Sequence, residues 1–320
     1  MIAAVGSQLL YLSRAEVERL LDVDAMLDAL ASALAAYSSG AASAPPRIAV
    51  RVEHGLLGVM PGHLPGVALE SKLVSVFPGN DEHGLPSHQG LIALFDEENG
   101  TPLALMDGTY ITAIRTGGSA AVAARVLARE DARVLAILGA GAQGRSHLDT
   151  FPRIRDFEEI RIASRNLERA NDLAAHHPRA HAVPSFEEAV RDADVVACCT
   201  DARAPILLRE WLKDGVHVSA VGGTFGPELD ADTIRDARVF VEWRGAATSA
   251  PPAGAHELQG IDLARVTEVG EVIAGKKPGR TSADEITVYK STGIAVEDAA
   301  TARLVYDAAM KARAGKKLDL

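Results

Sequence analysis

The sequence has little cysteine: only Cys198 and Cys199, which are adjacent. Adjacent cysteines rarely form a disulfide with each other, and two thiols without a nearby histidine cluster make a poor metal site. The sequence therefore predicts two small buried residues in a strand, a reducing compartment, and neither a disulfide framework nor a metal.

The chain also lacks a long apolar run and an excess of positive charge. No stretch approaches the length of an apolar membrane span, and the first residues lack the basic region of a signal peptide. We therefore expect a soluble, cytoplasmic protein. The formal net charge is −10, which disfavours electrostatic binding of nucleic acid or anionic lipid. A locally basic pocket for a small anion stays compatible with this charge.

The first part of the chain reads as an α+β domain. Ser13 and Glu16 have the spacing of a capping box, and apolar residues recur at helical spacing from Val17 through Leu34. From Ile48 the period changes towards two. Turn signals separate these runs at Pro61-Gly62, Pro78-Gly79-Asn80 and Asn99-Gly100. The pattern predicts an antiparallel sheet of hairpins.

From Arg133 the pattern becomes one of strands alternating with helices. Apolar runs at 134–138, 160–163, 195–199, 216–221 and 239–241 predict buried strands, with helical stretches between them. This alternation is typical of a doubly wound parallel sheet. The 320 residues are enough for two domains. We predict an α/β protein: a Rossmann-like domain at 118–292, and an α+β domain at 1–117 on which a C-terminal helix within 293–320 packs back.

A glycine-rich turn follows the first of these strands and opens a helix: Gly139-Ala140-Gly141-Ala142-Gln143-Gly144. In a dinucleotide site the first glycine permits the tight turn, the second lets the pyrophosphate approach the backbone, and the third lets helix and strand pack closely. The helix N-terminus presents free N–H groups to the phosphates. The segment therefore predicts a dinucleotide-binding site.

The end of the second strand distinguishes the two nicotinamide dinucleotides. NAD-binding proteins place an acidic residue there for the ribose 2′-hydroxyl, whereas this chain has Ser164-Arg165-Asn166. Arg165 can pair with a 2′-phosphate, and the other two side chains can donate hydrogen bonds to it. NADP(H) is therefore favoured, with NAD(H) as the alternative.

Three basic residues stand alone in apolar or turn sequence of the first domain: Arg47, Lys72 and Arg115. Lysine and arginine are seldom buried without a partner. Because the three lie on separate elements, they could converge on an anion, although a surface salt bridge would explain any one of them taken alone.

Over almost its whole length the chain resembles the ornithine cyclodeaminase/μ-crystallin family. The resemblance rests on three segments in order: GLPSHQGLIALFDEENGTPLALMDGTYITAIRTGGSAA, GAGAQGRSH, and VGEVIAGKKPGRTSADEITVYKSTGIAVEDAATARLVYD. It implies a homodimer built through the N-terminal sheet, with the active site between the domains.

The resemblance also implies roles for single residues. Arg47, Lys72 and Arg115 match the residues that hold the substrate carboxylate and assist the chemistry. A Lys72 desolvated beside guanidinium groups is expected to have a lowered pKa and to exchange a proton with the imine nitrogen. His88 is a further catalytic candidate. Cofactor contacts beyond the glycine turn and the second strand are expected at Ser87, Thr112, Thr200, Val221 and Ser291.

The family divides by chemistry, and one loop bears on the branch. Cyclodeaminases keep an Asp after the glycine pair that follows the fourth Rossmann strand, where this chain has Thr224. A threonine cannot act as a base for an ammonium group, although Glu228 or Asp230 could compensate. We therefore expect reduction of a small α-imino acid, or the reverse amino-acid dehydrogenase reaction. A cyclodeaminase and a non-catalytic dinucleotide-binding protein remain the alternatives.

Overall fold

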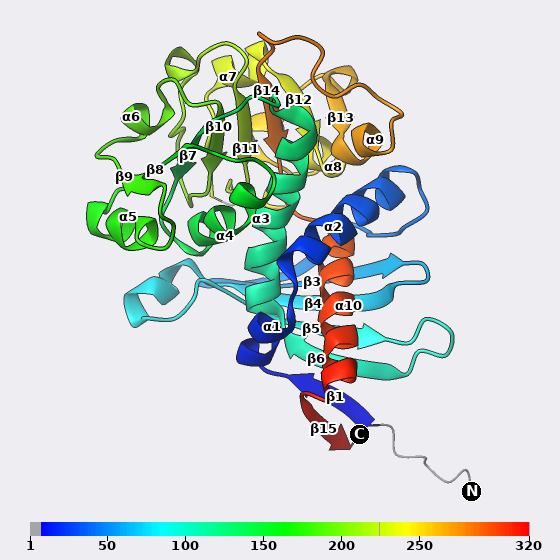
Figure 1. Cartoon of the computed structure of the whole chain (residues 1–320). Helices are drawn as coiled ribbons and strands as arrows, with labels where there is room; N and C mark the ends of the chain where they lie inside the picture. The colour runs from blue at the N-terminus through cyan, green and yellow to red at the C-terminus, as the bar shows by residue number, and fades with distance from the viewer. Residues whose placement is uncertain (1–7, 224, 320) are drawn as a thin grey trace, which may run out of the picture. The chain divides into compact units, whose positions relative to one another are not determined.

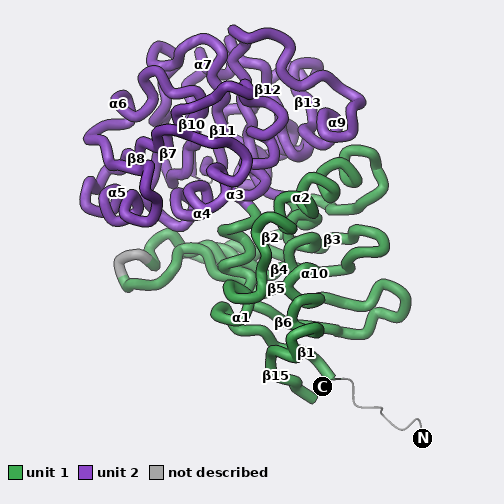
Figure 2. Tube along the Cα trace, viewed as in Figure 1, with its two compact units in different colours: residues 1–115, 294–320 green, residues 116–293 purple. Residues whose placement is uncertain are grey.

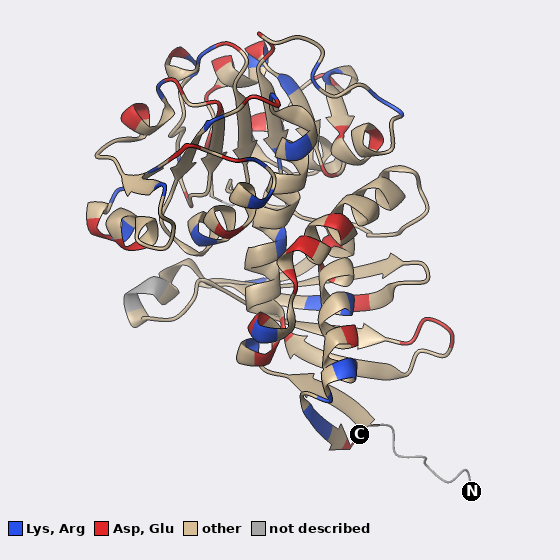
Figure 3. Cartoon of the chain, viewed as in Figure 1, with Lys and Arg blue, Asp and Glu red and all other residues tan. Residues whose placement is uncertain are grey.

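The computed structural model describes residues 8–223 and 225–319, and the chain divides into two compact units (Figure 2). Unit 1 comprises residues 1–115 and 294–320, and unit 2 comprises residues 116–293. From the sequence, the corresponding borders were expected after residues 117 and 292. Among the described residues, no helix has both the length and the apolar character needed to cross a membrane. Charges of both signs are interspersed along the ribbon of each unit (Figure 3).

Unit 1 is built on a seven-stranded sheet in the order β15-β1-β6-β5-β4-β3-β2 (Figure 1). Its strands are β1 (Gln8–Leu12), β2 (Ile48–Val52), β3 (Gly55–Leu64), β4 (Ala68–Val76), β5 (His88–Phe95), β6 (Pro102–Asp107) and β15 (Lys316–Asp319). From β2 to β6 each strand pairs antiparallel with the next, as the period-two pattern predicts. The turn expected at Pro61-Gly62 is wrong, because both residues lie within β3 and pair with Ser71 and Glu70 of β4. The sequence pattern did not indicate β1 and β15. These strands lie near opposite ends of the sequence and pair antiparallel with each other.

The helices of unit 1 are α1 (Arg14–Leu20), α2 (Val23–Ser38), the start of α3 (Gly108–Leu127) and α10 (Ala295–Ala312), with a short 3₁₀ helix η1 (Pro78–His83). The Ser13–Glu16 capping box is confirmed, since the Ser13 N–H donates to the Glu16 carboxylate at 2.8 Å. The residues with helical spacing from Val17 through Leu34 form two helices and not one continuous helix. Asp22 accepts hydrogen bonds from the backbone N–H groups of residues 24 and 25, and it therefore begins a second helix.

Helix α10 covers one face of this sheet, whereas the other, the open face, carries exposed side chains such as Leu73 and Leu91 among the described residues. Helix α10 lies against β3, β4 and β5 and also contacts α2 (Figure 1). Alternate residues of β4 that face this helix are buried, Glu70 and Lys72 among them. The residues between them, such as Leu73, lie on the opposite face.

Unit 2 is an eight-stranded parallel sheet in the order β13-β12-β14-β11-β10-β7-β8-β9. The strands are β7 (Val134–Leu138), β8 (Glu159–Ala163), β9 (Ala180–Ala182), β10 (Val195–Cys198), β11 (His217–Ala220), β12 (Arg238–Val241), β13 (Val266–Glu268) and β14 (Thr287–Lys290). The α/β, Rossmann-like fold is therefore confirmed. Strand β14 was not expected, although it lies between β11 and β12.

The helices of unit 2 are the rest of α3, α4 (Ala142–Thr150), α5 (Leu167–Ala174), α6 (Phe186–Val190), α7 (Ala231–Asp236), α8 (Gly245–Thr248) and α9 (Val269–Ile273). Short 3₁₀ helices are η2 (Phe151–Arg153), η3 (Arg209–Trp211), η4 (His256–Leu258) and η5 (Leu263–Arg265). Cys198 ends β10 and Cys199 follows it, and both are buried, free thiols.

Candidate functional site

The glycine-rich turn between β7 and α4 has the geometry that a dinucleotide requires. Gly139 has φ +117°, and a Cβ at that residue would lie 2.6 Å from the Cys199 carbonyl oxygen. A Cβ on Gly144 would lie 2.1 Å from the Gly139 carbonyl oxygen, so helix and strand are in contact there. A Cβ on Gly141 would meet nothing within 4 Å. The first and third glycines are therefore required by packing, while the second leaves open space for a pyrophosphate.

The N-terminus of α4 faces this space. Gly141 is its N-cap and offers no side chain to cap the first-turn N–H groups, and the first turn contains no acidic residue. A cavity of about 410 Å³ adjoins the turn, and its lining comprises Ala140, Gly141, Ala142, Arg145, Arg169, Asp172, Leu173 and His176. The free N–H groups and the two arginines fit the pyrophosphate of a dinucleotide.

The end of β8 carries the three residues expected at a 2′-phosphate. The Asn166 side chain caps α5 by accepting from the Arg169 N–H at 3.1 Å, and the Ser164 hydroxyl oxygen accepts from the Asn166 N–H at 3.3 Å. The Arg165 side chain is 84% exposed and lies 3.2 Å from the Asp201 carboxylate. Sequence reasoning missed Asp201, because it comes from the loop after β10 and only the sheet order brings it here.

Three further cofactor candidates follow neighbouring strands at the carboxyl edge of the sheet. Thr200 follows β10, Val221 follows β11 and Ser291 follows β14. Carboxyl ends of parallel strands share one edge, so these residues belong to the same edge as the glycine turn. The Ser291 hydroxyl is buried and donates to Glu242 at 3.4 Å.

Glu228 connects two of these strand ends. Its carboxylate accepts from the Thr200 N–H and hydroxyl at 2.8 Å each and from the Gly222 N–H at 2.8 Å. The Lys290 Nζ lies 3.8 Å from Glu228 Oε2. Burial raises the pKa of Glu228. Asp230 caps α7 by accepting from Thr233 N–H at 2.9 Å. Both carboxylates considered as replacements for a cyclodeaminase Asp therefore bind unit 2 backbone, while Thr224 itself lies outside the described residues.

Unit 1 contains a buried ionic cluster around Lys72. The Lys72 Nζ donates to Asp298 Oδ2 at 2.6 Å, and Arg115 Nε donates to Asp298 Oδ1 at 2.9 Å. A second nitrogen of Arg115 lies 2.7 Å from Glu297 Oε2. The four side chains come from β4, α3 and α10, and none is more than 5% exposed. The structure therefore brings two of the three predicted basic residues together.

The charges in this cluster shift one another. Burial, and then Arg115, lower the pKa of Lys72 from 10.5 to about 8, while Asp298 opposes the shift. Burial acts to raise the pKa of Asp298, but Arg115 and Lys72 outweigh it and hold that pKa below its usual value. The expected lowering of the Lys72 pKa is confirmed, with Arg115 as the guanidinium group that contributes to it.

The other predicted residues of unit 1 lie on different elements. Arg47 is half-buried immediately before β2, and His88 is exposed at the start of β5, 3.1 Å from the Ser87 hydroxyl through its Nδ1. Thr112 lies in α3 and donates to the Gly108 carbonyl at 2.6 Å. Their roles stay predictions.

Asp298 and Glu297 were missed by sequence reasoning. A signal was present, because two adjacent acidic residues interrupt the apolar and small residues of GIAVEDAAT. Such residues are almost never fully buried unless they are paired. Among residues 8–223 and 225–319, no group of three or more His, Cys, Asp or Glu side chains is placed to hold a metal ion.

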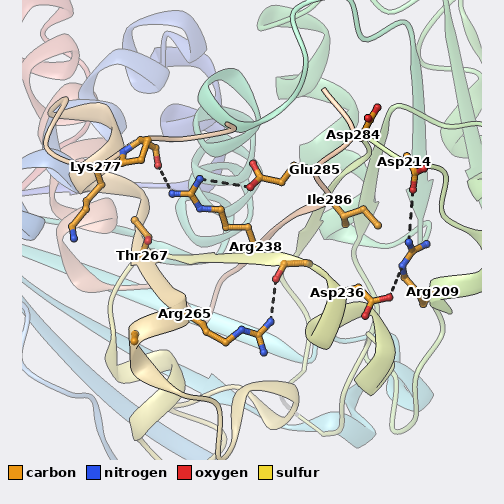
Figure 4. Close-up of a pocket in the computed structure, with 13 residues that line it drawn as sticks. Arg209, Asp214, Asp236, Arg238, Arg265, Thr267, Lys277, Asp284, Glu285 and Ile286 are labelled. Carbon is orange, nitrogen blue, oxygen red and sulfur yellow. Dashed lines mark hydrogen bonds and ion pairs between the residues drawn. The ribbon is translucent and has the colours of Figure 1, made fainter. Parts of the chain in front are cut away.

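A second cavity in unit 2, of about 690 Å³, lies where β12, β13 and β14 begin (Figure 4). Its charged lining is largely occupied by internal contacts. Arg265 donates to carbonyls at the end of α7, Arg238 to the Pro278 and Gly279 carbonyls, and Arg209 to Asp236. Ligands of doubly wound sheets bind at the opposite, carboxyl edge. This cavity is larger than the one at the glycine turn, but it is the weaker candidate.

Comparison with known proteins places this geometry in a family. The model of the ornithine cyclodeaminase/mu-crystallin family matches residues 8–313. The chain is 40% identical over 307 residues to ketimine reductase mu-crystallin of Mus musculus, with 93% of this chain and 96% of that protein covered.

Solved structures that are similar over almost the whole chain include the following two. Δ¹-pyrroline-2-carboxylate reductase of Thermococcus litoralis, in complex with NADH and L-proline, matches with a TM-score of 0.91 and 33% identity, covering 97% of this chain and 100% of that one. A dimeric archaeal alanine dehydrogenase with bound NAD matches with a TM-score of 0.89 and 34% identity, covering 98% and 99%. With these matches, the glycine turn and the buried lysine cluster, the chain belongs to the ornithine cyclodeaminase/mu-crystallin family.

Proposed function

We propose that this protein catalyses the NAD(P)H-dependent reduction of a small α-imino acid to the amino acid, or the reverse amino-acid dehydrogenase reaction. It is an NAD(P)-dependent oxidoreductase acting on CH–NH or CH–NH₂ groups. The observation that carries the proposal is the buried Lys72, whose ammonium group is fixed by Asp298 and has a pKa of about 8. The names of the relatives support the same reaction class, since they include a ketimine reductase and a pyrroline-2-carboxylate reductase.

The bound dinucleotide would supply or accept the hydride. Gly139, Gly141 and Gly144 shape the turn that admits its pyrophosphate, and the α4 N-terminus binds the phosphate charge. Arg47 and Arg115 hold the substrate carboxylate through charge-assisted hydrogen bonds. The two carboxylates that bind Arg115 also fix the position of its guanidinium group.

In this proposal Lys72 is the general acid of the reduction and the general base of the oxidation. A general acid works best when its pKa lies near the working pH, and burial with Arg115 brings the Lys72 pKa into that range. Lys72 gives its proton to the imine nitrogen during reduction and takes it back during oxidation. Asp298 stabilises the ammonium form and holds the Nζ in place.

NADP(H) is our proposed cofactor, with NAD(H) as the alternative. Two features of the end of β8 support the phosphorylated dinucleotide. Arg165 can pair with the 2′-phosphate, and no acidic residue stands there to repel it. Asp201 opposes it, because its carboxylate lies 3.2 Å from the same guanidinium group and would repel a 2′-phosphate. The arginine must therefore exchange one anionic partner for another.

Ornithine cyclodeamination is the alternative that the geometry disfavours. It requires an anionic group that accepts a proton from the second amine of ornithine. Glu228 and Asp230 are already bound to backbone N–H groups of unit 2, which makes them poor substitutes. The third possibility is a dinucleotide-binding protein without turnover.

We also propose a homodimer, formed through the open face of the unit 1 sheet. Ile48, Val59, Leu73 and Leu91 lie in register across β2, β3, β4 and β5 on that face. Leu73 and Leu91 are 41% and 43% exposed, and Ile48 is 70% exposed. A contiguous exposed apolar row marks an interaction surface.

We propose that the protein is located in the cytoplasm, in keeping with its two buried free thiols.

One assay panel tests the proposed reaction. Purified protein is incubated with NADPH or NADH and a set of cyclic and acyclic α-imino acids, and separately with NAD and L-ornithine. We expect loss of reduced-nicotinamide absorbance with an imino acid such as pyrroline-2-carboxylate, and little or no ammonia from ornithine. Proline and ammonia formation faster than any imine reduction would assign the cyclodeaminase reaction. Dinucleotide binding without either reaction would leave the non-catalytic alternative.

A further inference from the structure

Glu70 is a buried carboxyl group that has no role in the proposed mechanism. It lies on β4 two residues before Lys72, on the same face of the strand, and is 2% exposed. Neither of its oxygens has a hydrogen-bond partner among the described residues. Opposite it, β3 places Gly62 and β5 places Leu94. A Cβ on Gly62 would lie 2.9 Å from Glu70 Oε1, so the glycine makes room for this carboxyl group.

An unpaired carboxylate in such a position would be costly. Without a donor, a buried carboxylate loses its hydration and gains no hydrogen bond in return, so the protonated form is favoured. Burial and the nearby Asp298 carboxylate raise the pKa of Glu70 well above 4.5, while Lys72 and Arg115 act in the opposite direction. Geometry and electrostatics therefore both favour a neutral carboxylic acid.

The charge of the cluster depends on this group. Lys72 and Arg115 are balanced by Asp298 and Glu297, so the cluster is neutral overall when Glu70 is protonated. A substrate carboxylate bound by Arg115 adds one negative charge. If Glu70 were ionised, the substrate would meet a second, uncompensated negative charge in a poorly solvated site.

We propose that Glu70 is a neutral acid that sets the charge of the Lys72 cluster, so that the cluster accepts an anionic substrate only while Glu70 holds its proton. Glu70 is therefore a positioning residue: its protonation state changes the total charge of the cluster, and this charge affects substrate binding. The second half of this statement rests on the proposed function, because it requires that the cluster binds a substrate carboxylate.

Substrate-free experiments test the first half. We expect a carboxylic-acid band in the infrared spectrum of the wild-type protein at neutral pH that is absent from Glu70→Gln and retained in Glu98→Gln, whose side chain is exposed on the same unit. If Glu70→Gln does not fold, Glu70→Leu replaces it. Identical spectra for the wild type and the Glu70 variant would overturn the proposal.

Stability against pH gives an independent result. A raised carboxyl pKa means that the folded state binds more protons than the unfolded state above pH 4.5. The wild type therefore loses stability relative to Glu70→Gln as the pH rises from about 4.5 to the folded pKa of Glu70. The ratio of their unfolding constants should grow by up to about tenfold per pH unit in that window. A constant ratio would show that Glu70 is already ionised.

Binding of a non-reducible planar carboxylate, pyrrole-2-carboxylate, to the NADPH-loaded protein tests the second half. Above the pKa of Glu70, wild-type Kd should rise relative to that of Glu70→Gln by up to about tenfold per pH unit, and binding should take up a proton in calorimetry performed in several buffers. Parallel Kd profiles would overturn the charge-setting role. Failure of either protein to bind the carboxylate at any pH would overturn the proposed function, and with it this second half, while the infrared and stability results still decide the first.

Discussion

Lys72 has the local environment of a proton donor whose strength is set by burial and by two charged neighbours, Arg115 and Asp298. Burial and Arg115 favour the neutral amine, and Asp298 at 2.6 Å favours the ammonium ion. The balance leaves the pKa at about 8, more than two units below that of an exposed lysine. The group is therefore protonated at neutral pH and still able to lose its proton.

We expect the rate of imine reduction to fall as the pH rises through about 8, because the ammonium form of Lys72 is the proton donor. Lys72→Met should lower kcat by roughly 10²- to 10⁴-fold while leaving dinucleotide affinity nearly unchanged. Steady-state kinetics over a pH series, with fluorescence titration of NADPH, measure both. Lys317→Met, an exposed substitution in the same unit, is the control. A Lys72→Met enzyme with the wild-type pH profile would remove Lys72 from the chemistry.

Arg165 and Asp201 form the pair that decides between the dinucleotides. Arg165→Ala should weaken NADPH binding about tenfold or more and NADH binding hardly at all, since charge-assisted hydrogen bonds are worth about 1.5–3 kcal/mol. Asp201→Asn should strengthen NADPH binding, because it removes a carboxylate 3.2 Å from the guanidinium group. Calorimetric titration of both dinucleotides measures the effects, with Arg191→Ala, exposed on unit 2, as the control. Equal losses for both dinucleotides, or a wild-type preference for NADH, would contradict the NADP assignment.

At the scale of elements, the turn from β7 into α4 separates a packing requirement from a binding requirement. Gly144 is in contact with the Gly139 carbonyl, whereas Gly141 faces open space. The two glycines belong to one motif but have different physical reasons, so substituting each with alanine should give different outcomes.

Gly144→Ala should destabilise unit 2 by about 1–3 kcal/mol, because the added methyl group overlaps the Gly139 carbonyl and must displace α4. Gly141→Ala should leave stability within about 0.5 kcal/mol, yet weaken dinucleotide binding, because its methyl group enters the space left for the pyrophosphate. Denaturant unfolding and NADPH titration of the two variants provide the comparison, each being the control for the other. Normal NADPH affinity in Gly141→Ala would place the pyrophosphate elsewhere.

At the scale of the whole molecule, the proposed dimer would form through the open face of the unit 1 sheet. Leu73→Glu places a charge in the middle of the apolar row and should convert a dimer to a monomer, because burying an unpaired carboxylate costs several kcal/mol. Light scattering after size-exclusion chromatography gives the mass directly. Leu263→Glu, at a similarly exposed leucine of unit 2, should keep the dimer. A Leu73→Glu protein that remains dimeric would exclude this face as the interface.

The sequence by itself determined the local features whose causes are local. The Ser13–Glu16 capping box, the hairpins with period-two alternation, and the strand-turn-helix at Gly139–Gly144 all depend on residues close together in the chain, and all are present. Apolar runs alternating with helical stretches were enough to predict the parallel sheet. The break between α1 and α2 at Leu21 and Asp22 was not predicted, because the apolar spacing continues through it and gives no sign that Asp22 caps a new helix.

Only the tertiary structure decided which distant charges meet. Asp298 lies 226 residues from Lys72, and Asp201 lies 36 residues from Arg165, so no sequence spacing connects either pair. Glu70 is buried with no hydrogen-bond partner among the described residues, and this likewise depends on Gly62 and α10, which belong to other elements. Pairing and burial fix the charge states of these groups, because the energy of a charge depends on its solvation and on its neighbours in space. The sequence supplied the basic residues, and the fold supplied the carboxylates that set their chemistry.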